Sequence, residues 1–98
     1  MLTLPIKRKW FDMILSGEKK EEYREATEYY RRRFTNLFNA FDIDKQYIRF
    51  RNRYRSDSPT FTAACTWNIK AGREEWGAEQ GKEYYTLTIH EIKERSGC

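Results

Sequence analysis

Histidine and cysteine are scarce in this sequence of 98 residues, which has one histidine, His90, and two cysteines, Cys65 and Cys98. No CxxC pair and no cluster of His and Cys occurs, so the ligand spacing of a structural zinc site is missing. We therefore expect no metal and no cofactor. We also expect no disulfide scaffold, and a reducing cytoplasm is the compartment that fits this cysteine usage best.

Long apolar runs are missing as well. The longest uninterrupted apolar stretch is only a few residues long, which predicts neither a membrane-spanning helix nor the apolar segment of a signal peptide. No internal repeat, low-complexity tract or interdomain linker occurs. Residues 1–98 are therefore expected to form a single domain that does not enter the membrane.

Charge and aromatic rings are what the sequence has in quantity. Charged residues make up 35% and aromatic residues 16% of the chain, and the formal net charge is +4. Because each aromatic side chain buries about 150–250 Å², the core of this domain is expected to be built on rings. The basic balance, with a pI of about 9.1, favours a polyanionic partner such as nucleic acid.

The apolar pattern predicts about five strands and two helices. Strands are expected over residues 2–7, 19–25, 47–54, 61–69 and 84–92. Helical spacing is found over residues 7–17 and 27–41, with Gly17 as a left-handed C-cap of the first helix and Thr27 as an N-cap of the second. The residues after 92 are expected to be frayed. These elements predict an α+β fold, a small curled sheet or open β-barrel with the helices packed at its mouth.

Side-chain periodicity also predicts which faces are buried. The alternating residues of the strand over 61–69 are expected to share the core face: Phe61, Ala63, Cys65, Trp67 and Ile69. In the second helix, Tyr30, Phe34, Leu37, Phe38 and Phe41 follow the buried stripe, and the three consecutive arginines 31–33 are expected on its solvated side. Trp10, in the first helix, is expected in the core.

Opposed charges crowd behind Gly17, where residues 17–24 read GEKKEEYR. In an extended segment, Lys20, Glu22 and Arg24 would share one face and Lys19, Glu21, Tyr23 and Glu25 the other. Each face mixes signs, so one interpretation is a surface ladder of ion pairs worth about 0–1 kcal/mol each. The other is a ligand cleft, in which a Glu22–Arg24 pair presents a fixed guanidinium to a phosphate or base edge. Lys19 in a dry cleft would be suited to act as a general base.

Residues 17–24 match the pattern G-x-K-x-x-E-x-R, and together with WFDMIL over residues 10–15 they resemble the ASCH domain family of the PUA-like superfamily. The resemblance implies a PUA-like β-barrel that binds RNA, with Lys19, Glu22 and Arg24 lining a cleft between the barrel and its helices. One bacterial branch of the family removes the acetyl group from N4-acetylcytidine, and some members are reported to cut RNA. That branch has a threonine at the position of Glu22, and a carboxylate cannot act as a hydroxyl nucleophile.

A second candidate surface is the strand over 47–54. Arg49, Arg51 and Arg53 recur at every second residue, about 6.6–6.8 Å apart, which roughly follows successive phosphates of an extended single strand. Tyr47 and Tyr54 add rings that could stack on bases. The alternative is a solvent-facing strand whose arginines protect an edge from aggregation.

Two further residues are candidates for ligand contact. Asn52 is the odd polar residue in line with the apolar residues of its strand, so it either bonds the backbone or faces the cleft. Trp76 lies in a glycine-bounded loop and is either a stacking platform or a plug at the end of the barrel.

Three classes of function follow from these patterns. The first is RNA or nucleotide binding, with ligand contacts from Lys19, Glu22, Arg24, Arg49, Arg51, Asn52 and Trp76. The second is a hydrolase acting on a modified nucleoside or on RNA, with Lys19 and Glu22 as catalytic residues. The third is a protein-interaction module in which the arginines of 47–54 meet an acidic partner. The sequence leaves the oligomeric state open.

Overall fold

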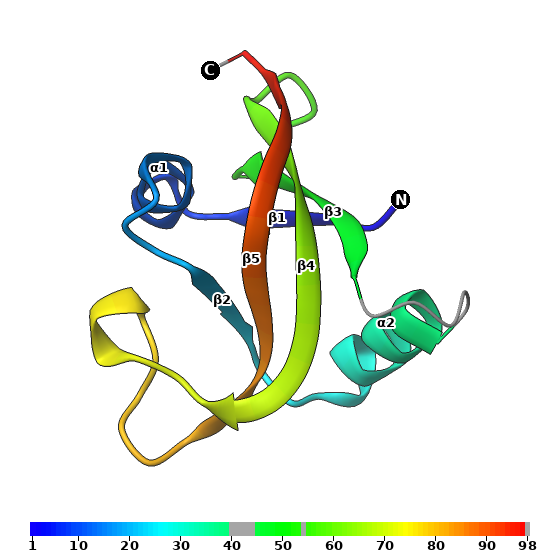
Figure 1. Ribbon diagram of the computed structural model, residues 1–98, viewed down its shortest axis with the longest axis vertical. Coiled ribbons are helices and arrows are strands. Elements are labelled where there is room, and N and C mark those ends of the chain that lie inside the picture. Colours follow the sequence, from blue (N-terminus) through cyan, green and yellow to red (C-terminus); the bar gives the residue numbers. More distant parts are fainter. Residues whose placement is uncertain (40–44, 54, 98) are drawn as a thin grey trace.

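The computed structural model describes residues 1–39, 45–53 and 55–97. Its elements in chain order are β1 (Thr3–Ile6), α1 (Arg8–Ser16), β2 (Glu21–Arg24), α2 (Glu28–Asn39), β3 (Gln46–Asn52), β4 (Thr60–Ala71), the short 3-10 helix η1 (Glu74–Trp76) and β5 (Glu83–Ser96) (Figure 1). The described residues form a small α+β domain with one five-stranded mixed sheet and two α-helices. The predicted α+β class, with five strands and two helices, is confirmed.

The strand order in the sheet is β1-β3-β4-β5-β2. β1 pairs parallel to β3, and the other three pairs are antiparallel. β1 and β2 are the two edges, and no ladder joins them within the described residues, so the sheet is not closed into a barrel. The long β4–β5 hairpin crosses β1 in Figure 1, with α1 and α2 on its two sides.

Both helices begin and end where the sequence predicted, as far as they are described. Gly17 ends α1 with a φ of 86°, and its N–H donates to the carbonyl of Ile14 at 3.1 Å. At the start of α2, the Thr27 hydroxyl accepts a hydrogen bond from the Tyr30 N–H at 3.3 Å. Arginines 31–33 are exposed, as expected. Phe41 and Tyr54 lie outside the described residues.

The core is built on aromatic rings from both helices and the sheet. Phe11, Phe34, Phe50 and Phe61 are fully buried. The Phe61 ring centroid lies 4.9 Å from that of Phe11 and 5.2 Å from that of Phe50. Cys65 is also buried, and this burial raises the pKa of its thiol to about 12.

Two strand predictions need correction. Ile69 was expected on the core face but is 54% exposed. It lies beyond Trp67, the residue of β4 that packs on the rings of α2, so the buried alternation ends before the strand does. The residues after 92 are not frayed but continue β5 to Ser96, because the start of β4 supplies them with backbone partners, with Thr60 opposite Ser96.

None of the helices in the described part of the chain is long and apolar enough to cross a membrane.

Candidate functional site

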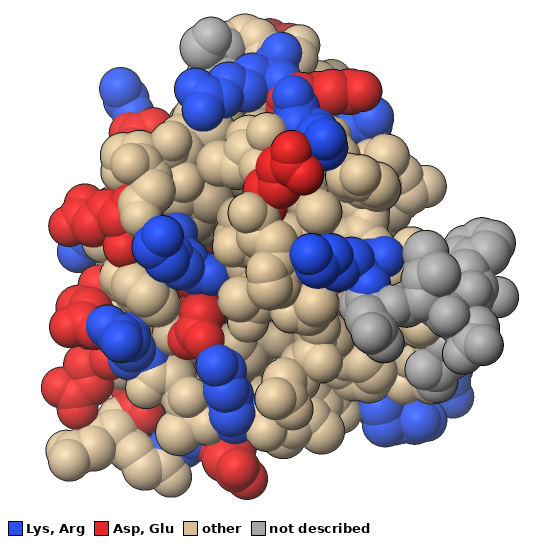
Figure 2. All heavy atoms as spheres, viewed as in Figure 1, with Lys and Arg blue, Asp and Glu red and all other residues tan. Residues whose placement is uncertain are grey.

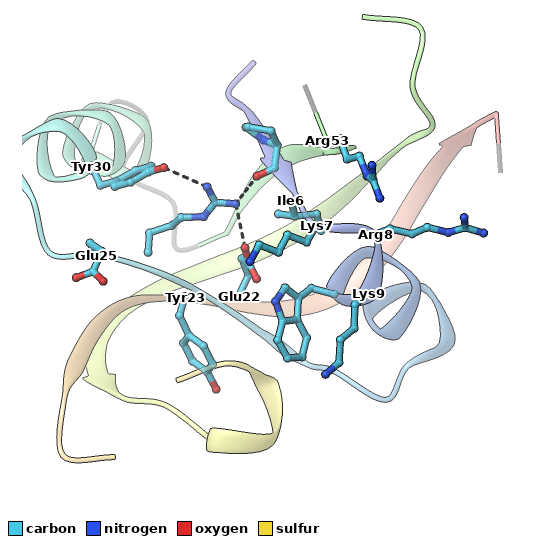
Figure 3. Close-up of a pocket in the computed structure, with 12 residues that line it drawn as sticks. Ile6, Lys7, Arg8, Lys9, Glu22, Tyr23, Glu25, Tyr30 and Arg53 are labelled. Atoms are coloured by element: carbon cyan, nitrogen blue, oxygen red, sulfur yellow. Dashed lines mark hydrogen bonds and ion pairs between the residues drawn. The ribbon is translucent and has the colours of Figure 1, made fainter. Parts of the chain in front are cut away.

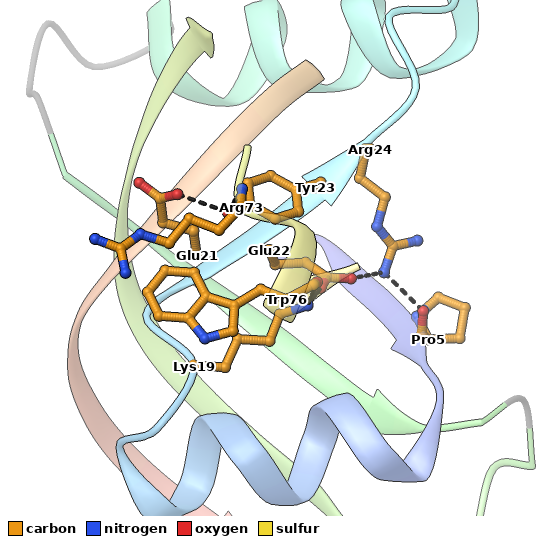
Figure 4. Close-up of polar contacts among 8 residues, drawn as sticks. All are labelled: Pro5, Lys19, Glu21, Glu22, Tyr23, Arg24, Arg73 and Trp76. Atoms are coloured by element: carbon orange, nitrogen blue, oxygen red, sulfur yellow. Dashed lines mark hydrogen bonds and ion pairs between the residues drawn. The ribbon is translucent and has the colours of Figure 1, made fainter. Parts of the chain in front are cut away.

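The three charged side chains of the motif meet in one cluster (Figure 4). The Glu22 carboxylate accepts from the Lys19 ammonium at 3.0 Å with one oxygen and from the Arg24 guanidinium at 2.9 Å with the other. We call these three residues the charged cluster. Lys19 was expected on the strand face opposite Glu22, but it precedes β2 and its N–H donates to the carbonyl of Met13 at 3.0 Å. It therefore does not follow the alternation of the strand.

The charged cluster is buried. The side chains of Lys19, Glu22 and Arg24 are 2%, 7% and 12% exposed. Removing such groups from water costs several kcal/mol per ion unless each charge is paired and hydrogen-bonded. The cluster is therefore not a solvated ladder of ion pairs, and its geometry depends on all three charges being present.

Lys19 is held from two further directions. Its ammonium donates to the backbone carbonyl of Trp76 at 2.7 Å and lies 4.2 Å from the ring centroid of Trp10. Burial lowers the pKa of Lys19 below its ordinary value, and the neighbouring Glu22 carboxylate only partly offsets this effect. The ammonium is thus tied to the η1 loop and more easily deprotonated than a lysine in water.

The guanidinium of Arg24 spans the gap between the two edges of the sheet. It donates to the backbone carbonyl of Pro5 in β1 at 2.8 Å and to the hydroxyl of Tyr30 in α2 at 3.1 Å, in addition to Glu22. Its Nε is buried and has no hydrogen-bond partner among the described residues. The fork is therefore held in place by three hydrogen bonds.

A cavity of about 710 Å³ opens beside Glu22 and Arg24 (Figure 3). Its lining combines exposed cations (Lys7, Arg8, Lys9 and Arg53), rings (Trp10, Tyr23 and Tyr30) and the carboxylates of Glu22 and Glu25. Lys7 extends toward Glu22, whereas Arg8 points away from the cavity. The volume falls within the range of about 300–1,000 Å³ that is typical of small-molecule sites.

A second hollow of about 240 Å³ lies on the other side of the cluster. Glu22 and Trp10 line both spaces, whereas Lys19 lines only the smaller one. Trp76 also borders the smaller hollow and is 9% exposed, with the Arg73 guanidinium 4.8 Å from its ring centroid. Trp76 is therefore packed in place as a plug and is not a free stacking platform.

The loop that carries Trp76 is fixed to β2 through Tyr23. The Tyr23 hydroxyl donates to Glu21 at 2.7 Å and accepts from the backbone N–H of Arg73 at 2.9 Å. A Cβ at position 72 would lie 2.7 Å from the Tyr23 ring. Gly72 is therefore required for the close approach of this loop to the strand.

The remaining predicted site residues do not join the charged cluster. Arg49 and Arg51 line a separate hollow of about 420 Å³ and not the large cavity. Asn52 donates its backbone N–H to Pro59 at 2.9 Å, and its side-chain oxygen is buried with no hydrogen-bond partner among the described residues. Asn52 does not line the large cavity either.

Sequence reasoning missed several residues of the cavity. Trp10 was expected in the core but is only half-buried and lines both hollows. The run Lys7-Arg8-Lys9-Trp10 directly ahead of the motif is a signal that could have indicated a basic rim. The contact between Tyr30 and Arg24 had no such signal, because it joins residues of a helix and a strand through their tertiary packing.

No family model, curated protein or solved structure matches this chain. Among the residues that the structure describes, no three His, Cys, Asp or Glu side chains are grouped so that they could hold a metal ion.

Replacing Glu22 by glutamine should destabilise the fold by about 3–5 kcal/mol, because it leaves two buried cations without a compensating charge. Urea denaturation measures this loss. Glu28→Gln is the matched control, since the Glu28 carboxylate also contacts two arginines, Arg31 and Arg32, but at the exposed surface of α2. Its effect should be much smaller because water screens those pairs. Equal losses in the two variants would contradict the structural role of the cluster.

Lys19 should make stability depend on pH below 10.5, the ordinary pKa of lysine. Its folded-state pKa is lowered from the ordinary value of 10.5, so between these two values the unfolded chain binds a proton that the folded chain does not. The free energy of unfolding should therefore rise with pH through this window. Urea denaturation of wild type and Lys19→Met at several pH values up to 10.5 tests this. The free energy of unfolding of wild type relative to Lys19→Met should increase as the pH rises. Parallel pH curves for the two proteins would contradict this role of Lys19.

Proposed function

We propose that this chain is an ASCH-like domain of the PUA-like superfamily that binds a nucleoside or nucleotide, free or within RNA, in the large cavity. The observation that carries the proposal is the Arg24 guanidinium, which is fixed by Glu22, Pro5 and Tyr30 while its buried Nε has no partner among the described residues. A rigid guanidinium with an unfilled donor at a cavity wall suits a ligand that carries an acceptor. The match of Lys19, Glu22 and Arg24 to the ASCH motif supports the same function.

The cavity supplies the types of contact that a nucleotide needs. The rings of Trp10, Tyr23 and Tyr30 offer surfaces on which a base could stack. The carboxylates of Glu22 and Glu25 can accept hydrogen bonds from an exocyclic amino group. The exposed cations Lys7, Lys9 and Arg53 of the cavity lining can contact a phosphate through charge-assisted hydrogen bonds, whereas Arg8 points away.

Nucleotide binding fits this arrangement better than a protein-interaction module. An acidic protein surface would require exposed cations over a broad area. On the face shown in Figure 2, basic and acidic side chains are instead intermixed on a largely uncharged surface. The cations of the large cavity surround a concave space with aromatic walls, which favours a compact aromatic ligand.

Replacing Lys7 and Lys9 together by alanine should weaken nucleoside monophosphate binding by about three- to tenfold, because two exposed charge contacts are lost. Binding of the unphosphorylated nucleoside should be unchanged. Chemical-shift titrations with nucleosides and their monophosphates measure both affinities and locate the site. The control variant Lys45→Ala with Lys93→Ala removes the same charge from exposed positions outside the cavity lining. Ligand-induced shifts that avoid the cavity residues would overturn the proposal.

A second candidate is a hydrolase that acts on a modified nucleoside or on RNA. The observation in its favour is Lys19, whose pKa is lowered by burial, because a lysine that loses its proton more easily is better suited to act as a general base. Against it, Lys19 lines the small hollow and not the large cavity, and Glu22 provides no hydroxyl nucleophile.

Incubation with N4-acetylcytidine and with labelled RNA separates the two candidates. We expect binding without turnover, because the lysine does not face the cavity that would hold the nucleoside. Product formation that disappears in Lys19→Met, but persists in the double variant of Lys45 and Lys93, would establish the hydrolase instead.

A further inference from the structure

The hollow that contains Arg49 and Arg51 is built on two rows of residues across the sheet. One row pairs Arg51 of β3 with Thr60 of β4 and Ser96 of β5, and the next pairs Arg49 with Thr62 and Glu94. Directly paired residues of neighbouring strands point to the same face of a sheet. Both arginines therefore point away from Ile48 and Phe50, which are buried in the core, into a hollow of about 420 Å³.

This hollow has an excess of unpaired positive charge. Arg49 and Arg51 line it, and neither of them forms an ion pair with an acidic residue in the described ranges. It contains two carboxylates, of which Asp57 is already paired with Arg55 at 3.3 Å. The other, Glu94, carries a single negative charge against two guanidinium groups.

Arg51 also has a donor without an acceptor. Its Nε is buried and has no hydrogen-bond partner among the described residues. A buried N–H that is left unpaired costs free energy, and an oxyanion seated in the hollow would remove that cost. Hydroxyl groups of Ser56, Ser58 and Ser96 line the same space and can donate further hydrogen bonds to an anion.

We propose that this hollow binds phosphate groups of a single-stranded RNA whose nucleoside occupies the large cavity. The inference rests on the proposed function and makes its ligand more specific, a nucleotide within a strand. Arg49 and Arg51 are two residues apart on β3, or about 6.6–6.8 Å, a spacing that roughly follows successive phosphates of an extended strand. Guanidinium groups are suited to this contact because their planar fork matches phosphate oxygens.

The two sites lie on one path across the surface. Pro5, which lines the large cavity, is the register partner of Arg51 in β1. Arg53 follows Arg51 by two residues and lies on the rim of the cavity, at the point where a φ of 69° ends the strand. A strand leaving the cavity would therefore pass Arg53 before it reaches Arg51 and Arg49.

The test is the salt dependence of RNA binding by the double variant Arg49→Gln with Arg51→Gln, which keeps much of each side-chain stem and removes the charge. Fluorescence anisotropy measures the affinity for a labelled single-stranded RNA of about ten nucleotides at several salt concentrations. Affinity should fall, and the slope of log K against log salt should fall by about 1.4, since each phosphate contact contributes about 0.7 for single strands. The variant Lys45→Gln with Lys93→Gln, which makes the same charge change, should retain the wild-type slope.

Titration of a nucleoside monophosphate and of inorganic phosphate, followed by chemical shifts, separates this inference from the proposed function. The arginine variant should bind the monophosphate in the cavity with the affinity of wild type. This result, together with the reduced salt slope for RNA, would support the inference. An unchanged salt slope would overturn the inference. Binding of inorganic phosphate at the hollow, with the RNA affinity unchanged in the arginine variant, would overturn it as well. Binding of an acidic peptide in place of RNA would overturn it too. RNA binding that depends on both arginines, without any nucleoside in the cavity, would overturn the proposed function and leave only the phosphate contacts at the hollow.

Discussion

The Glu22 carboxylate is shared between two buried cations, and this arrangement positions most of the candidate site. Lys19 carries the contact to the η1 loop through the Trp76 carbonyl, and Arg24 carries it to β1 and to α2. Three other segments, the η1 loop, β1 and α2, are thus tied to β2 through one anion. A buried charge without partners is strongly unfavourable. The cluster therefore favours one relative placement of these segments over any placement in which its charges would be unpaired.

That placement also fixes one wall of the large cavity. The Arg24 guanidinium donates to three acceptors and has little freedom to turn, so its position at the cavity wall is fixed. Groups that are already ordered lose less entropy on binding than mobile ones, which improves affinity for a given number of contacts. The exposed lysines of the rim contrast with this interior, since they remain mobile and provide charge more than geometry.

Patterns within single elements could be predicted from the sequence, and arrangements between elements largely could not. Gly17 and Thr27 mark helix ends through local hydrogen bonds, and the alternation of Ile48 and Phe50 follows from the pleat of a strand. Ile69 was misplaced because its exposure depends on how far α2 reaches along β4. The position of Lys19 was misjudged because a turn, not strand alternation, sets its direction, and the role of Tyr30 exists only once α2 packs beside β2.

The contact between Arg24 and Pro5 also affects how this sheet meets other chains. An edge strand usually exposes a row of backbone donors and acceptors that a foreign strand can extend into a larger sheet. In β1, proline provides no N–H at this position, and its carbonyl is already engaged by the guanidinium. The edge strand β1 is thereby a poor template for intermolecular strand pairing and for the aggregation that it would seed.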